Sequence, residues 1–170
     1  MTRTAAFQGN ALTLNGKEII LNEQLPQFTL TGNDMADVTK DILKNKIAVV
    51  LALPSLDTPV CSIETKRFNE EVAKLTNVVV LAVSRDLPFA QKRWCAAEGI
   101  ANLVTASDYK YRTFGPAFGV EISEWSLLSR AVFVTGKDGV VRYVEYVEEI
   151  SAEPKYAEIL KIVGELATNA

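Results

Sequence analysis

Hydrophobic residues gather in two short runs near the middle of the chain. Residues 47–53 read IAVVLAL and residues 78–84 read VVVLAVS. Both runs are rich in β-branched residues and do not alternate with polar positions, which is typical of strands buried on both faces of a parallel sheet. We therefore expect these residues to form two central parallel strands.

Hydrophobic positions at helical spacing follow each of these runs. Residues 61–75 place their hydrophobic residues on one stripe and their charges on the other side, so they predict a crossover helix. The stripe consists of Cys61, Thr65, Phe68, Val72 and Leu75. A second helix is expected from Pro88, which the first turn of a helix tolerates, to a stop at Gly99. This alternation of strand and helix predicts an α/β fold.

The N-terminal part of the chain predicts antiparallel structure. Apolar and polar residues alternate there, and Asn15-Gly16 is a strong signal for a two-residue hairpin turn. We expect an N-terminal hairpin within residues 1–22. A short strand is expected to follow at residues 28–32.

The C-terminal part predicts a second hairpin over residues 130–147, with its turn at 136–139, and a closing amphipathic helix over 153–167. A chain of 170 residues can bury roughly two thirds of its unfolded surface in one core, and it is short for two ordinary domains. We therefore expect a single domain over residues 1–170, with the N-terminal hairpin as an extension.

The composition is that of a soluble globular protein, with 48% hydrophobic and 23% charged residues. The formal net charge of -3 is spread along the chain without a basic cluster, so we expect neither nucleic acid nor an anionic membrane as a partner. The N-terminus lacks the apolar core of a signal peptide, and nowhere do about 18 apolar residues run together. The expected location is cytoplasmic.

The chain contains no histidine and only two cysteines. This composition excludes Ser–His and Cys–His nucleophile pairs and the common zinc sites, so we expect no metal. Two cysteines are too few for a disulfide scaffold, and a reducing compartment tends to keep them as free thiols. Any chemistry has to use thiol, carboxylate, hydroxyl, lysine or arginine groups.

Cys61 ends the stretch PSLDTPVC, which directly follows the first buried run. Because Pro59 keeps the preceding backbone from being helical, Cys61 falls in the first turn of the predicted helix, at the carboxyl end of a strand. Unpaired N–H groups and the helix dipole favour an anion there, and ligands bind at such strand ends. Its position on the hydrophobic stripe equally fits a small core residue, so both interpretations stay open.

A reactive Cys61 requires a positive group. The thiolate is the nucleophile, and an ordinary thiol is mostly protonated at neutral pH. A helix terminus contributes at most ~2 kcal/mol, less than the ~3.4 kcal/mol that would leave such a thiol largely ionised. Thr58 can add a hydroxyl hydrogen bond, but the charge has to come from a Lys or Arg that the fold brings in.

Cys95 lies in the second predicted helix, off the edge of its hydrophobic stripe. That stripe consists of Leu87, Ala90, Trp94 and Ala97. Cys95 is therefore a poor candidate for a core residue, and two interpretations remain: an incidental surface thiol, or a second thiol that attacks an oxidised Cys61. A disulfide needs Cα atoms within roughly 7 Å of each other. We expect one or both helices to loosen when the two cysteines meet.

The sequence around Cys61 resembles a known family. PSLDTPVC matches the peroxiredoxin pattern P-x-x-x-T-x-x-C, and in its fuller form, P-S-x-D-T-x-V-C, it resembles the thiol peroxidase branch of that family. Further segments agree in the family's order: FQGN, SRDLPFAQKRWCAAEG, SRAVFVTGKDGVV and EISAEPKYAEIL. The resemblance covers nearly the whole chain.

This resemblance implies a thioredoxin-like fold, in which helices flank a central mixed β-sheet and an N-terminal β-hairpin precedes it. It implies an enzyme that reduces hydrogen peroxide and alkyl hydroperoxides to water and alcohols without a cofactor. In that family the cysteine of the motif, here Cys61, attacks the peroxide and becomes a sulfenic acid. The second cysteine, here Cys95, resolves the sulfenic acid to an intramolecular disulfide.

The resemblance also implies roles for three further residues and for partners. Thr58 would orient the peroxide and the thiolate, Pro54 would shield the pocket from water, and Arg130 would supply the positive charge. Without the resemblance, Arg130 is expected to be a surface residue at the end of a strand. Thioredoxin is the implied reductant, and a homodimer is the implied assembly.

Two other functions are compatible with the same fold. A thiol–disulfide oxidoreductase normally relies on a C-x-x-C pair, which this chain lacks. A non-enzymatic redox sensor would form the disulfide but would not turn over with thioredoxin and its reductase. The combination of Pro54, Thr58, Cys61, Cys95 and Arg130 favours the enzyme, although the fold alone would not.

Overall fold

The computed structural model describes residues 2–169, so the ends of the expected domain, residues 1 and 170, lie outside the described part. The strands are β1 (Arg3–Phe7), β2 (Asn10–Asn15), β3 (Thr29–Gly32), β4 (Asp37–Thr39), β5 (Ile47–Ala52), β6 (Val78–Ser84), β7 (Val104–Ser107), β8 (Glu121–Ile122), β9 (Leu127–Leu128), β10 (Ala131–Thr135) and β11 (Val141–Tyr146). The helices are the 3-10 helix η1 (Lys40–Leu43) and the α-helices α1 (Pro59–Val72), α2 (Pro88–Glu98), α3 (Phe114–Ala117) and α4 (Tyr156–Thr168). None of the helices within residues 2–169 has the length and apolar character needed to cross a membrane.

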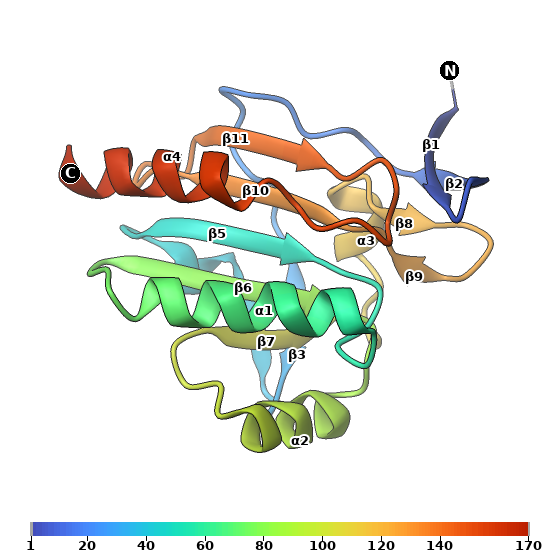
Figure 1. The fold of residues 1–170 in the computed structure, drawn as a ribbon, viewed down its shortest axis with the longest axis horizontal. Helices are drawn as coiled ribbons and strands as arrows, with labels where there is room; N and C mark the ends of the chain where they lie inside the picture. The colour runs from blue at the N-terminus through green and yellow to red at the C-terminus, as the bar shows by residue number, and fades with distance from the viewer. Residues whose placement is uncertain (1, 170) are drawn as a thin grey trace.

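The main sheet has seven strands in the order β11-β10-β5-β6-β7-β3-β4 (Figure 1). Strands β5, β6 and β7 run parallel in its middle, and β10 and β3 join them antiparallel on either side. The two hydrophobic runs of the sequence are β5 and β6, so the prediction of central parallel strands is confirmed. The predicted C-terminal hairpin is also confirmed, since β10 pairs antiparallel with β11.

Strand β5 is buried along its whole length because both faces of the sheet are covered. Val50 faces a hydrophobic cluster that includes Phe118, which follows α3. Val49 faces the opposite cluster, to which α1 and α4 contribute Phe68 and Ile159. Figure 1 shows α1 and α4 lying along the same side of the sheet. This two-sided burial explains why the strand reads as an unbroken hydrophobic run.

Helix α1 begins at Pro59, two residues before the predicted start, and ends before Leu75. The rest of the predicted stripe is buried, as expected. The helix also buries Glu64 and Asn69, two polar residues that hydrophobic periodicity does not predict. The side-chain oxygen of Asn69 accepts a hydrogen bond from the backbone N–H of Asn102 at 2.8 Å.

Helix α2 spans the predicted residues, and Gly99 ends it in the left-handed conformation with φ 66°. The stripe predicted for it is confirmed at Trp94, which is buried, but is wrong at its ends, because Leu87 is 54% exposed and Ala97 is exposed as well. Its buried residues are Pro88, Gln91 and Trp94. Gln91 can occupy a core position because its amide nitrogen donates to the Ser84 hydroxyl and to the Ala106 carbonyl, both at 3.0 Å.

The N-terminal hairpin is confirmed, but its turn is not at Asn15-Gly16. Strands β1 and β2 pair antiparallel around Gln8 and Gly9, which both have positive φ. Asn15 instead ends β2, which goes on to pair with β8, with Asn15 opposite Glu121. Gly16 has φ 103°, and a Cβ atom there would lie 2.0 Å from the carbonyl oxygen of Pro116. Glycine is required at this position by the close approach of the α3 segment, not by a two-residue turn.

Gly16→Ala tests this reason for the glycine, with Gly9→Ala as its matched control. Both glycines have positive φ, but nothing lies within 4 Å of a Cβ atom at Gly9. The control should therefore lose only about 1 kcal/mol of stability, from backbone strain. We expect Gly16→Ala to lose at least about 2 kcal/mol more, because the added methyl group meets rigid backbone. Urea denaturation measures both, and equal losses would contradict the packing argument.

Candidate active site

Cys61 lies in the first turn of α1 and is fully buried. Thr58 is the N-cap of this helix. Its hydroxyl oxygen accepts a hydrogen bond from the backbone N–H of Cys61 at 3.3 Å, and its hydroxyl group donates to the carbonyl oxygen of Ser55 at 3.0 Å. Pro59 follows at the start of the helix, where a missing N–H costs nothing. The Thr58 hydroxyl therefore fixes the backbone of the first turn, and its proton is directed to Ser55 and not to the sulfur.

Arg130 supplies a cation at the sulfur of Cys61. Its Nη2 donates to Sγ of Cys61 at 3.1 Å, and its Nε donates to the carbonyl oxygen of Ile150 at 2.9 Å. Only 2% of Arg130 is exposed, so the alternative of a surface arginine at a strand end is wrong. The positive group that a reactive Cys61 requires thus comes from the residue immediately before β10.

Glu64 is the other charged partner of Arg130, and hydrophobic periodicity gave no sign of it. Its Oε2 accepts a hydrogen bond from Nη1 of Arg130, while its Oε1 is buried without a partner among the described residues. Burial raises the pKa of Glu64 to about 7, even though the charge of Arg130 acts in the opposite direction. Burial would lower the pKa of Arg130, but Glu64 and Cys61 outweigh it and raise that pKa. The only signal in the sequence is a carboxylate one helical turn after Cys61.

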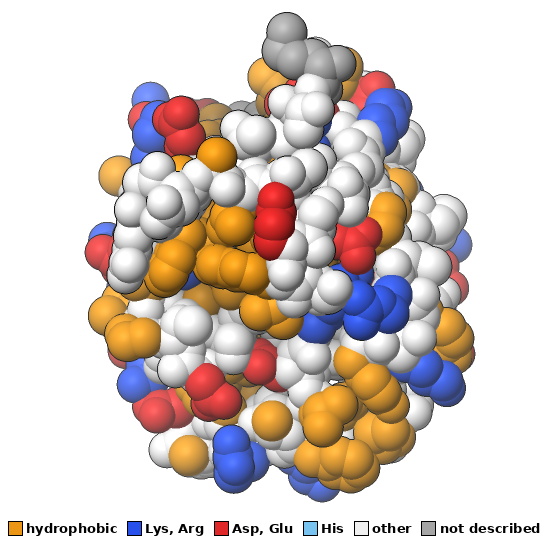
Figure 2. Space-filling view, turned by 90° about the vertical axis from the view of Figure 1, so that its right-hand side faces the viewer, with side chains coloured by type: hydrophobic (Ala, Val, Ile, Leu, Met, Phe, Trp, Pro, Cys, Tyr) orange, Lys and Arg blue, Asp and Glu red, His pale blue; other side chains and the backbone are white. Residues whose placement is uncertain are grey.

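An apolar pocket of about 310 Å³ lies beside this cluster. Its apolar lining includes Phe7, Pro54, Val60, Trp125, Leu127 and Ile150, and it also reaches Thr58 and Arg130. Figure 2 looks onto the end of the molecule where α1 begins and β8 and β9 lie, and hydrophobic side chains gather there in patches between charged ones. An apolar compound in this pocket would lie next to the two residues that contact Cys61. Trp125 and Phe7, which sequence reasoning missed, pack edge to face with ring centroids 5.1 Å apart.

Cys95 lies apart from this cluster, on α2. Its Sγ is 3.4 Å from the Thr105 hydroxyl and 4.0 Å from the amide nitrogen of Asn33. It is half-buried and packs against the same hydrophobic cluster that contains Cys61, so it is less peripheral than its place off the predicted stripe indicates. Both cysteines are free thiols. The structure thus brings Pro54, Thr58, Cys61 and Arg130 together and leaves Cys95 on a different helix.

Within residues 2–169, no group of three or more Asp, Glu, Cys or His side chains lies close enough together to hold a metal ion. The groups available for chemistry beside the pocket include the thiol of Cys61, the guanidinium of Arg130 and the hydroxyl of Thr58. A thiolate held by a buried cation is a nucleophile suited to attack on a polarisable bond.

Comparisons with known proteins identify relatives of this chain. The family model described as Redoxin matches residues 21–160. The chain is 47% identical over 155 residues to a thiol peroxidase of Halalkalibacterium halodurans, covering 91% of this chain and 93% of that protein. It is 46% identical over 150 residues to a thiol peroxidase of Bacillus subtilis, covering 88% of this chain and 90% of that protein.

Solved structures show the same fold. A peroxiredoxin-like protein from Aquifex aeolicus superposes with a TM-score of 0.90 at 42% identity, covering 96% of this chain and 97% of that chain. A thiol peroxidase from Chromobacterium violaceum has the same fold, with a TM-score of 0.89 at 19% identity and 98% of each chain covered. The predicted thioredoxin-like α/β fold, with its mixed sheet and N-terminal hairpin, is confirmed.

Glu64→Gln removes the titrating carboxyl of the buried cluster and keeps its shape. The pKa of Glu64 is about 7 in the folded protein and ordinary in the unfolded chain, so the folded state binds the proton more tightly. This contribution to stability is fully present below the unfolded pKa and is lost as the pH rises through about 7. Relative to Glu64→Gln, the unfolding free energy of the wild type should fall by an amount on the order of 1 to 3 kcal/mol between about pH 5 and about pH 8.

Urea denaturation at several pH values measures this difference. Glu70→Gln, at an exposed position of the same helix, controls for the loss of a helix charge. A difference between wild type and Glu64→Gln that stays constant with pH would mean that Glu64 remains ionised beside Arg130.

Proposed function

Because the chain belongs to the thiol peroxidases of the redoxin family, we propose that Cys61 is the cysteine that attacks the hydroperoxide and Cys95 the cysteine that resolves the oxidised sulfur. Its activity is that of a thiol peroxidase, a peroxiredoxin enzyme. The contact of 3.1 Å between Nη2 of Arg130 and Sγ of Cys61 carries the assignment of the attacking cysteine. Cys95, in contrast, contacts a hydroxyl and an amide group, which stabilise a thiolate less than a buried cation does.

In the first step the thiolate of Cys61 attacks one oxygen of the hydroperoxide. An S–O bond forms and the O–O bond breaks, so that sulfur is oxidised to sulfenic acid and the other oxygen leaves as an alkoxide or hydroxide. This leaving group takes up a proton and departs as an alcohol or as water. Arg130 stabilises the thiolate and faces the oxygens on which charge develops. Thr58 orients the attacking sulfur through the backbone of the first turn.

In the second step the thiol of Cys95 attacks the sulfenic acid, a disulfide forms and water leaves. Two features support α2 as the helix that moves. Its N-cap residue, Leu87, makes no side-chain capping hydrogen bond, and two large apolar side chains at its start, Leu87 and Phe89, are 54% and 67% exposed. A helix end without a cap and with exposed apolar residues opens at low cost. Opening of α2 would carry Cys95 toward Cys61.

The apolar lining of the pocket supports organic hydroperoxides as substrates in addition to hydrogen peroxide. Burying an alkyl or aryl group against Pro54 and Trp125 removes apolar surface from water, which favours binding. Pro54 also covers the pocket beside Arg130, where it limits access of water to the reacting sulfur. The peroxide oxygens would then lie next to Thr58 and Arg130.

Regeneration of the two thiols requires an external dithiol, and we take thioredoxin as that reductant because the resemblance of the sequence to the peroxiredoxin family implies it. A cytoplasmic location suits this cycle, since a reducing compartment keeps both thiols available. A homodimer is proposed on the same resemblance.

Cysteine variants test the division of roles. We expect reduced wild type and Cys95→Ser to be oxidised rapidly by cumene hydroperoxide, whereas Cys61→Ser should react no faster than a small-molecule thiol. Only the wild type should end as a disulfide and turn over with thioredoxin and its reductase. Stopped-flow fluorescence follows the oxidation, with Trp94 beside Cys95 as a reporter. Slow oxidation of wild type would mean an unactivated Cys61, and a disulfide that forms without turnover would indicate a redox sensor.

Thr58→Val and Thr58→Ser form a matched pair that tests the hydroxyl group. Valine keeps the branched shape but removes the oxygen that caps α1, which should cost about 1 kcal/mol of stability. It should also slow the oxidation of Cys61 by about ten- to a hundredfold, because the sulfur is no longer held in place. Serine should restore both properties. If Thr58→Val reacts as fast as Thr58→Ser, the hydroxyl has no part in the reaction.

A further inference from the structure

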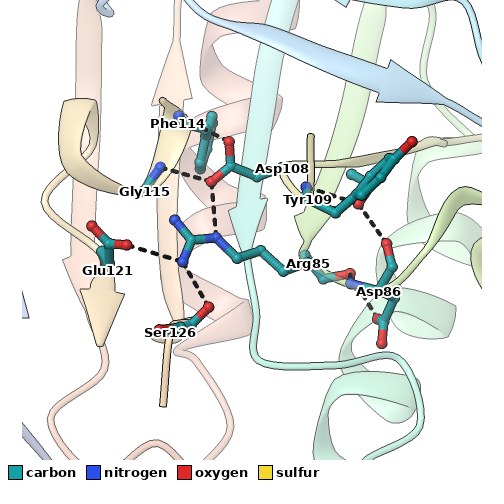
Figure 3. Close-up of polar contacts among 10 residues, drawn as sticks. Arg85, Asp86, Asp108, Tyr109, Phe114, Gly115, Glu121 and Ser126 are labelled. Carbon is teal, nitrogen blue, oxygen red and sulfur yellow. Dashed lines mark hydrogen bonds and ion pairs between the residues drawn. The ribbon is translucent and has the colours of Figure 1, made fainter. Parts of the chain in front are cut away.

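Arg85 is a buried cation that the proposed reaction does not use. It follows β6, and only 3% of its side chain is exposed. Its Nε donates to the carboxylate of Asp108 at 3.2 Å, and its Nη1 donates to the carboxylate of Glu121 at 3.0 Å and to the carbonyl oxygen of Ser126 at 2.6 Å. Figure 3 shows the guanidinium between these three groups. Arg85 thus joins the end of β6 to the segment that contains β8 and β9.

The Ser126 carbonyl belongs to the tight turn between β8 and β9. Ser126 has a positive φ of 54°, and its N–H donates to the carbonyl oxygen of Ile122 at 2.8 Å. Its neighbours in sequence, Trp125 and Leu127, both line the apolar pocket. The hydrogen bond from Arg85 therefore holds the turn at the residue between two side chains of the pocket wall.

Asp108, which pairs with Arg85, is itself held by several hydrogen bonds. Asp108 is fully buried, and its carboxylate also accepts hydrogen bonds from the backbone N–H groups of Phe114 and Gly115, at 3.0 and 3.2 Å. Gly115 leaves room for the arginine, since a Cβ atom there would lie 2.9 Å from its Nη2. Buried charges are costly unless they are fully paired, so such a network is a poor way to gain stability alone. The network does fix the distance between the end of β6 and the segment that contains β8 and β9.

The next residue, Asp86, holds another part of the pocket lining. Its carboxylate accepts hydrogen bonds from the Ser55 hydroxyl at 2.7 Å and from the backbone N–H of Leu56 at 2.8 Å. These residues belong to the loop that leads from Pro54 to Thr58. In Figure 3 the side chains of Arg85 and Asp86 point to opposite sides of the backbone. Two consecutive residues thus hold two segments that line one pocket.

We infer that Arg85 is a positioning residue that fixes the pocket wall formed by Trp125 and Leu127, and that this wall sets the preference for bulky organic hydroperoxides over hydrogen peroxide. The inference rests on the proposed function in taking this pocket as the hydroperoxide site. A bulky apolar substituent contacts the wall and needs it in place. Hydrogen peroxide needs only the Cys61, Thr58 and Arg130 groups. The Asp86 contacts, in contrast, act on the loop that carries Thr58 and so affect both substrates.

Arg85→Lys is the variant that tests this inference. Lysine keeps a charge for Asp108 but cannot reach Asp108 and the Ser126 carbonyl together. For cumene hydroperoxide we expect KM to rise with little change in kcat, and for hydrogen peroxide we expect neither to change. The ratio of the two kcat/KM values should fall by about tenfold or more. Equal losses for both substrates, or no loss, would overturn the inference.

Two controls accompany this variant. Asp86→Asn should lower kcat/KM for both substrates by a similar factor, because it loosens the loop before Cys61. Arg142→Lys makes the same substitution in an exposed ion pair with Asp138 and should leave both substrates unaffected. If Arg85→Lys does not fold, Glu121→Gln keeps the pair between Arg85 and Asp108 and should shift the ratio in the same direction by a smaller factor. An unchanged ratio for Glu121→Gln would then overturn the inference.

Fluorescence tests the position of the wall independently of catalysis. The chain has two tryptophans, Trp94 and Trp125, so a Trp94→Phe background leaves Trp125 as the only one. Acrylamide should quench Trp125 more strongly when Arg85→Lys is added. Unchanged quenching would overturn the inference whatever the kinetics show. Because this measurement does not involve Cys61, it separates a failure of the inference from a failure of the proposed roles of the cysteines.

Discussion

The side chain of Arg130 joins parts of the chain that lie far apart in the sequence. From its place before β10 it donates hydrogen bonds to Cys61 and Glu64 on α1 and to the carbonyl oxygen of Ile150 ahead of α4. A buried guanidinium costs several kcal/mol unless its donors are paired. The positions of α1 and of the segment at Ile150 are therefore constrained by the need to supply these partners. The same constraint places a cation at the sulfur.

The positive charge beside Cys61 has two partners and is not part of a simple ion pair. Arg130 is shared between a thiol and a carboxyl, and burial raises the pKa of Glu64 to about 7. When Glu64 is protonated, the positive charge of Arg130 acts mainly on the Cys61 sulfur; when Glu64 is ionised, that charge is divided between the sulfur and the carboxylate. A second buried arginine, Arg85, faces the carboxylates of Asp108 and Glu121 and makes no such contact with a thiol. In the proposed reaction one arginine thus contacts the attacking sulfur, and the other holds the pocket wall.

The two cysteines differ in how firmly they are held. Cys61 lies in a helix whose first turn has a side-chain cap, and this helix packs against the centre of the sheet. Cys95 lies in a short helix without a side-chain cap. The exposed apolar residues at the start of this helix bury little surface and so contribute little to its stability. This difference suits a pair in which one thiol has to be preorganised and the other has to move. The cysteine that is held more firmly, Cys61, is thus the one that contacts the cation of Arg130.

Local patterns in the sequence determined much of this protein. The central strands, the bounds of α2 and the C-terminal hairpin follow from hydrophobic spacing, proline and glycine, because these act over a few residues. The Pro, Thr and Cys positions of the motif also lie within one loop and one helical turn. What only the tertiary structure decided is which distant groups meet: Arg130 with Glu64, Gly16 with Pro116, and Gln91 with the sheet. Sequence patterns record which residues avoid water, whereas the partner of a buried polar group is set by how the elements pack, and packing is a property of the whole chain.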